Sequence, residues 1–172
     1  MPDGNILSFG NHLRFANFTV EFPVTTIFPK GEHMKLFFAG SIRGGGGYGK
    51  VYRRIIALLK SHGNVISEHL YHNGNSKQGG EIPDTAIHAR DSSAIRQADV
   101  VCAEVSHPSI GVGYEIGLAE SLGIPVIALY HGGSEYRLSA MVSGNEKIMI
   151  LSYDTFEELD SLLEKALTRF SA

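Results

Sequence analysis

The sequence predicts an α/β fold, a single domain built on a doubly wound, five-stranded parallel sheet. From residue 34 onward, short apolar runs rich in β-branched residues alternate with longer segments of helical periodicity. This alternation is typical of right-handed βαβ crossovers that place helices on both faces of a sheet. The chain has 172 residues, of which 43% are hydrophobic and 19% are charged, which is enough to form one buried core.

Five strands and five helices are expected in alternation. The expected strands are residues 35–40, 64–68, 99–105, 125–130 and 147–151. The expected helices are residues 49–62, 84–97 with Asp84 as the cap, 112–122, 137–143, and a last one beginning at a capping box of Asp154 and Glu157. Such strands usually take the order 2-1-3-4-5 of flavodoxin-like and Rossmann-like folds. Ligands then bind at the carboxyl ends of the first and third strands.

Residues 1–33 differ from the rest of the chain, because they contain five phenylalanines but no helical period. We expect an N-terminal extension of unknown role over 1–33, with a short strand within 17–22, and the functional domain over 34–172. The first residues lack the basic and apolar segments of a secretory signal. With one cysteine, Cys102, and no apolar run near 18 residues, the sequence favours the cytoplasm.

Two glycine-containing loops fall at the expected ligand-binding edge. The net charge of −3 argues against a basic nucleic-acid binder. The excess of glycine is local, since five of the 20 glycines lie in residues 44–49. In the loop 40–50, glycines and a helix N-terminus favour an anion, and Ser41 and Arg43 add phosphate donors. Val51 stands where a P-loop needs Ser or Thr, so that motif is excluded. A flexible turn is the alternative.

The second loop, residues 106–115, ends at Glu115, which we expect in the first turn of a helix with a lowered pKa. A carboxylate beside a phosphate suits stabilisation of, or attack on, a cationic sugar carbon. Asp91 is the second candidate carboxylate. The alternatives are a helix-start glutamate and a solvated aspartate. His69 and His72 lack further ligands at metal spacing, so no metal is expected.

Motifs spread in order over residues 34–170 resemble a known family. They are FFAGSIRGG at 37–45, EH at 68–69, IHARD at 87–91, ADVVCAEV at 98–105, PSIGVGYEIG at 108–117 and RLSAM at 137–141. These closely resemble the 2′-deoxynucleoside 5′-monophosphate N-hydrolases, which belong to the nucleoside 2-deoxyribosyltransferase superfamily. The extension lies outside the resemblance.

The resemblance implies hydrolysis of the N-glycosidic bond of a nucleoside 5′-monophosphate, with Glu115 as nucleophile and Asp91 as acid. It implies a homodimer in which Ser139 reaches the phosphate from a neighbouring subunit, and it places His69 near the base. The full set of residues expected at the substrate is Phe37, Gly40, Ser41, Ile42, Arg43, Gly44, Gly45, His69, Ser109, Gly111, Gly113, Ser139 and Met141. No cofactor, nucleic acid or membrane is expected.

Phe37 is a departure from the pattern. Family members that prefer deoxynucleotides carry Tyr at this position, whereas the related cytidine-monophosphate hydrolases carry Phe. A phenyl ring leaves space for a 2′-hydroxyl, so we expect activity on at least one ribonucleotide. A core aromatic is the alternative for Phe37. For the whole protein, the alternatives are a nucleoside 2-deoxyribosyltransferase and a non-catalytic nucleotide-binding module.

Overall fold

The computed structural model describes residues 33–41, 49–67 and 82–170, together with the backbone of three short N-terminal strands. These strands, β1 (Ser8–Phe9), β2 (His12–Phe15) and β3 (Phe18–Glu21), form an antiparallel sheet of their own. The strand expected within residues 17–22 is therefore present as β3. The division of the chain at residue 33 stays a prediction.

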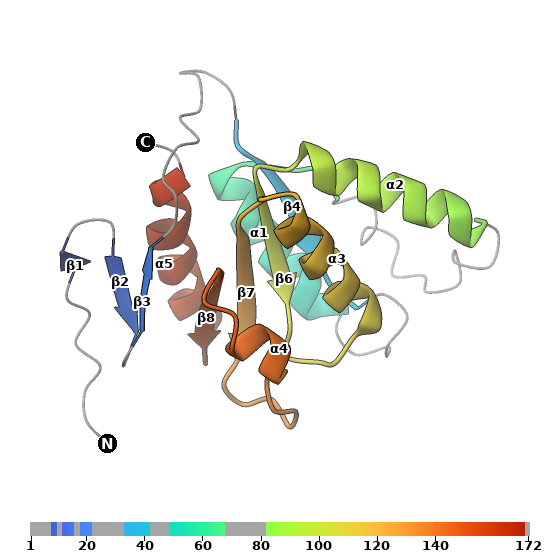
Figure 1. Cartoon of the computed structure of the whole chain (residues 1–172). Coiled ribbons are helices and arrows are strands. Elements are labelled where there is room, and N and C mark those ends of the chain that lie inside the picture. The colour runs from blue at the N-terminus through green and yellow to red at the C-terminus, as the bar shows by residue number, and fades with distance from the viewer. Residues whose placement is uncertain are drawn as a thin grey trace.

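The main sheet has five parallel strands in the order β5-β4-β6-β7-β8, which confirms the expected 2-1-3-4-5 topology (Figure 1). Its strands are β4 (Lys35–Ala39), β5 (Asn64–Val65), β6 (Val100–Glu104), β7 (Val126–His131) and β8 (Ile148–Tyr153). The winding reverses between β4 and β6. The ends of these two strands therefore form the switch point at which doubly wound folds bind ligands.

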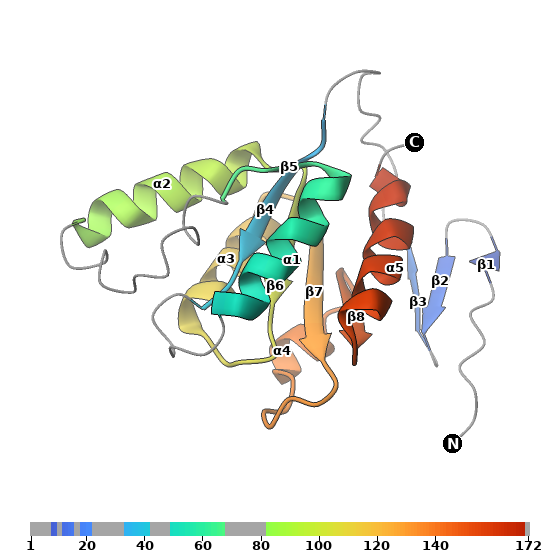
Figure 2. The same ribbon diagram turned by 180° about the vertical axis from the view of Figure 1, so that it is seen from behind.

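Helices cover both faces of the sheet. α1 (Gly49–His62) and α5 (Phe156–Leu167), the latter continued by a 3-10 turn at Thr168–Phe170, lie on one face, in front of the sheet in Figure 2. α2 (Asp84–Gln97), α3 (Ile110–Ser121) and the short α4 (Ala140–Ser143) contribute to the core on the other face. Among the described residues, no helix is both long and apolar enough to cross a membrane.

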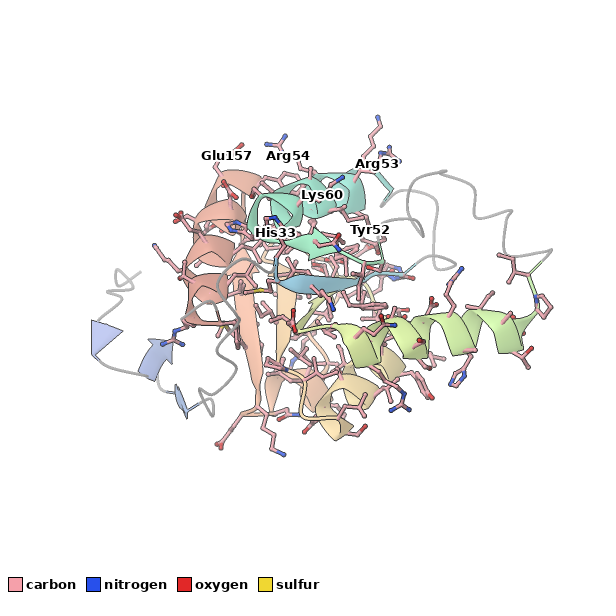
Figure 3. The ribbon with its side chains drawn as sticks, turned by 90° about the horizontal axis from the view of Figure 1, so that it is seen from above. His33, Tyr52, Arg53, Arg54, Lys60 and Glu157 are labelled. Atoms are coloured by element: carbon pink, nitrogen blue, oxygen red, sulfur yellow. The ribbon has the colours of Figure 1, made fainter. Side chains whose placement is uncertain are left out.

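The core consists of two clusters because successive strand side chains point to opposite faces. Phe38 packs beneath α1, with its ring centroid 5.6 Å from that of Tyr52, whereas Phe37 packs beneath α2 and α3. The apolar face expected for the last helix is confirmed, since Leu159, Leu163, Ala166 and Leu167 are all buried. On the outside, Arg54 of α1 pairs with Glu157 of α5 at 3.0 Å (Figure 3).

Several element ends differ from the expectation. The last helix is capped by Thr155, whose Oγ1 accepts from Glu158 N, and Glu158 in turn accepts from Asp154 N. The capping box is thus shifted by one residue from Asp154 and Glu157. Asp84 is the first helical residue rather than the cap, since Pro83 occupies the cap position.

β5 is shorter than the expected strand 64–68, because the chain turns at residues 66 and 67. The buried Ser67 hydroxyl accepts from Phe38 N at 2.8 Å and donates to Phe38 O at 3.0 Å. A side chain therefore replaces further ladder bonds at this edge. The helix expected at 137–143 begins only at Ala140.

Candidate active site

The carboxyl end of β4 turns closely beneath α1. A Cβ atom on Gly40 would lie 3.1 Å from the Phe38 ring and 3.2 Å from the Tyr52 ring, so a larger residue would displace one of them. Just beyond, Ser41 N donates to the Tyr52 hydroxyl at 3.2 Å. This contact holds the start of the glycine-rich loop at the switch point. Ile42, Arg43, Gly44, Gly45 and His69 lie outside the described residues.

α3 begins at Ile110, two residues earlier than expected, and Ser109 is its N-cap. The Ser109 hydroxyl accepts from Val112 N at 3.4 Å. A hydroxyl that accepts one bond can still donate its own hydrogen to a ligand. The Cβ positions of Gly111 and Gly113 have no close contacts, with only Ser109 Oγ at 3.8 Å from the former. The first turn of α3 is therefore open, with a hydroxyl at its start.

Glu115 is the sixth residue of α3 and so lies in its second turn, not in the first as expected. Burial, and secondly the negative charge of Asp91, raise the pKa of the Glu115 carboxyl to about 8. The expectation of a lowered pKa is therefore wrong. The helix dipole acts mainly within the first turn, so at this depth desolvation and charge repulsion dominate.

Asp91 of α2 is the source of that repulsion. Its side chain is 15% exposed, and Arg90 binds it with two guanidinium nitrogens, Nε at 2.7 Å and Nη2 at 3.2 Å. Asp91 is thus a partly buried, paired carboxylate and not a solvated one. The two candidate carboxylates, which are 24 positions apart in the sequence, are close enough to interact electrostatically.

A polar contact between α2 and α3 lies beside this pair. His88, one helical turn before Asp91, makes a hydrogen bond of 2.9 Å to the hydroxyl of Tyr114, the residue before Glu115. Their rings are 5.7 Å apart, and Ser92 Oγ lies 3.4 Å from the same histidine nitrogen. These contacts join the two helices that carry the carboxylates.

The other expected substrate residues are dispersed. Phe37 is fully buried in the core between the sheet and α2 and α3. Ser139 is exposed at the N-cap position of α4, without a side-chain capping bond, and Met141 is 84% exposed. Within the described residues, no three His, Cys, Asp or Glu side chains are grouped to hold a metal ion.

Sequence reasoning missed a polar cluster at the ends of β6 and β7. Glu104 is only 2% exposed and accepts from Ser106 N at 3.1 Å, while Ser106 Oγ accepts from His131 N at 2.8 Å. The available signal was a carboxylate inside an otherwise apolar strand, since such a residue is rarely buried without a specific partner.

Comparisons with known proteins agree with the expected family. The family model described as nucleoside 2-deoxyribosyltransferase matches residues 36–163. A Syntrophotalea carbinolica protein named as a 2′-deoxynucleoside 5′-phosphate N-hydrolase is 52% identical over 134 residues, which cover 78% of this chain and 94% of that protein. The Mus musculus 5-hydroxymethyl-dUMP N-hydrolase is 41% identical over 138 residues, which cover 76% of this chain and 78% of that enzyme.

Two solved structures share the fold. The Clostridium botulinum CMP N-glycosidase BcmB has a TM-score of 0.56 at 18% identity and covers 77% of this chain and 98% of its own. BlsM has a TM-score of 0.63 at 20% identity and covers 82% of this chain and 93% of its own. At these identities the likeness shows the fold alone. The family model and the close relatives show more: the chain belongs to the nucleoside 2-deoxyribosyltransferase family.

Proposed function

We propose that this protein is a hydrolase that cleaves the N-glycosidic bond of nucleoside 5′-monophosphates, releasing the free base and a (deoxy)ribose 5-phosphate. One observation carries the proposal: two carboxylates, Asp91 and Glu115, interact on neighbouring helices at the edge where β4 and β6 end. The names of close relatives, which are N-hydrolases of 2′-deoxynucleoside 5′-phosphates and of 5-hydroxymethyl-dUMP, support the same chemistry.

A carboxylate pair is sufficient for this reaction. Glu115 attacks C1′ of the sugar as the bond from C1′ to the base breaks, and Asp91 gives its proton to the leaving base. Asp91 then takes a proton from water, whose oxygen attacks C1′ and frees Glu115. This is the double displacement of retaining glycosidases, and neither step requires a metal or an organic cofactor.

The phosphate is bound by the loop after β4 and by the start of α3. Ser41 and Ser109 supply hydroxyl donors from these two places, Arg43 supplies a guanidinium, and Gly45 allows the backbone to approach the phosphate. The remaining substrate contacts come from Gly40, Ile42, Gly44, His69, Gly111, Gly113 and Met141, while Phe37, which is fully buried, influences the sugar from within the core rather than by an exposed surface.

The site is completed by a second copy of the chain, whose Ser139 reaches the phosphate. The exposed apolar side chains support this homodimer, since Ile110 of α3 is 95% exposed and Met141 of α4 is 84% exposed. Nothing lies within 4 Å of the Cβ positions of Gly113 and Gly117, which leaves this side of α3 open to close approach. The cytoplasm is the proposed location, because the free thiol of Cys102 suits a reducing compartment.

Base release from single nucleotides tests the proposal. Wild-type protein and the Glu115→Gln variant are incubated with ribo- and deoxyribonucleoside 5′-monophosphates, and free base is separated by chromatography. Only the wild type should release base. A nucleotide that binds but stays intact would identify a binding module. Release that depends on an added foreign base, with a new nucleoside 5′-monophosphate of that base as product, would identify a transferase.

A further inference from the structure

Glu104 is a buried carboxyl that the proposed reaction does not use. It ends β6 on the face of Cys102, beneath α1 and α5, whereas Asp91 and Glu115 belong to helices on the opposite face. Burial raises the pKa of the Glu104 carboxyl. Oε1 accepts from Ser106 N at 3.1 Å, and Oε2 has no hydrogen-bond partner among the described residues. Such a group is costly to bury, so its position calls for an explanation other than packing.

The residue that Glu104 holds, Ser106, joins two loops. Its hydroxyl accepts from His131 N at 2.8 Å, and its carbonyl accepts from the Ser134 hydroxyl at 2.6 Å. Ser106 lies in the loop from β6 to α3, three residues before Ser109. His131 and Ser134 lie at the end of β7 and in the segment after it. One buried serine therefore fixes these two connections relative to each other.

The segment after β7 is itself held together. Ser134 Oγ accepts from Tyr136 N at 3.1 Å, and the Tyr130 hydroxyl donates to Tyr136 O at 2.9 Å. The Tyr136 ring also packs edge-on against His107 of the other loop, with centroids 4.9 Å apart. Ser139 follows only three residues after this unit, so displacement of the unit displaces Ser139.

We propose that Glu104 and Ser106 are positioning residues for the phosphate end of the substrate, because together with Ser134 they fix the places of Ser109 and Ser139. This inference rests on the proposed function, in which both serines contact phosphate. It assigns no contact between Glu104 or Ser106 and the substrate. Their loss should therefore weaken phosphate binding more than it slows cleavage.

Serine variants separate the two effects. Ser106→Ala removes the acceptor for His131 N, and Ser134→Ala removes the donor to Ser106 O. Loss of a hydrogen bond of this kind corresponds to about a 3- to 10-fold change in an equilibrium. We expect KM for a nucleoside 5′-monophosphate to rise by about that factor in each variant, with kcat within about twofold of wild type. The inhibition constant of inorganic phosphate should rise in parallel.

Matched variants provide the controls. Ser121→Ala removes an exposed hydroxyl that only donates to Leu118 O within α3, and should change neither constant. Glu104→Gln keeps an oxygen acceptor for Ser106 N and should stay near wild type, whereas Glu104→Ala should resemble Ser106→Ala. Circular dichroism checks that each variant is folded.

Two results would overturn the inference. One is that KM and the inhibition constant of phosphate are unchanged in Ser106→Ala and Ser134→Ala. The other is that kcat falls by a larger factor than KM rises. Failure of the proposed function looks different, because the wild type itself would then release no base. In that case, calorimetric titration of the same variants with inorganic phosphate still tests the positioning role.

Discussion

Replacement of Glu115 by Gln should make the stability of the folded protein less dependent on pH. The Glu115 carboxyl has a pKa of about 8 in the folded protein, against an ordinary value of 4.5. Between these values the folded chain keeps a proton that the unfolded chain has lost. Stability is therefore lost as pH rises from about 4.5 to about 8. Gln has nearly the same size and no charge, so the variant lacks this loss.

The magnitude follows from the two pKa values. Each pKa unit corresponds to about 1.4 kcal/mol, so well above pH 8 the upper limit of the penalty is about 5 kcal/mol. Glu115 is partly exposed, and water that reaches the carboxylate reduces this figure. We expect the free energy of unfolding of Glu115→Gln, relative to wild type, to increase by about 2–3 kcal/mol between pH 5 and pH 9.

Urea unfolding at pH 5, 7 and 9, with matched protein concentrations, measures this difference by linear extrapolation. Glu135→Gln, at an exposed position outside the site, is the control and should follow the wild-type curve. A difference between Glu115→Gln and wild type that is the same at all three pH values would refute the reasoning, because it would show that the carboxyl is not desolvated in the folded state.

Three further predictions concern the reaction. Asp91→Asn should lower kcat by about 100- to 10,000-fold, the range for loss of a general acid, and full activity would exclude Asp91 as the acid. Titration of this variant should show a lower pKa for Glu115, because the neighbouring charge is gone. Sedimentation should show a dimer, and mixing Glu115→Gln with Ser139→Ala should restore part of the activity, whereas monomer alone would contradict a shared site. Wild type should cleave at least one ribonucleotide, and Phe37→Tyr should shift kcat/KM toward the deoxy substrate by about 1–3 kcal/mol; a core role alone predicts lost stability with an unchanged ratio.

The fold could be predicted because it depends on periodicity. The alternation of apolar runs with helical segments is enough to predict the order of the five strands. The same kind of pattern predicts the apolar face of the last helix, whose central residues are buried. β5 was too long in the prediction because its last ladder bonds are made by a serine hydroxyl. A polar residue after a short apolar run gives no sign that its side chain pairs with a distant backbone.

The electrostatics of the site could not be predicted from position alone. The sequence places Glu115 near a helix start, where the helix dipole is expected to lower the pKa of its carboxyl. The helix begins earlier, at Ile110, so Glu115 lies in the second turn, where burial raises this pKa instead. Arg90 is adjacent to Asp91 in the sequence, but their bidentate contact can be recognised only from side-chain positions. The same holds for Ser106, whose partners are 25 and 28 positions away.

The raised pKa of Glu115 leads to a consistent account of the proposed cleavage. The reaction needs one ionised carboxylate to attack and one protonated acid to release the base, so the active pair carries a single proton. In the ligand-free protein that proton lies on Glu115, while Arg90 binds Asp91 through two nitrogens. Cleavage requires the opposite arrangement, in which the proton lies on Asp91. The proposed reaction therefore needs a proton to move from Glu115 to Asp91 before the base leaves. A pKa of about 8 keeps that proton in the site at neutral pH, whereas two independent carboxyls with ordinary values would both have lost theirs.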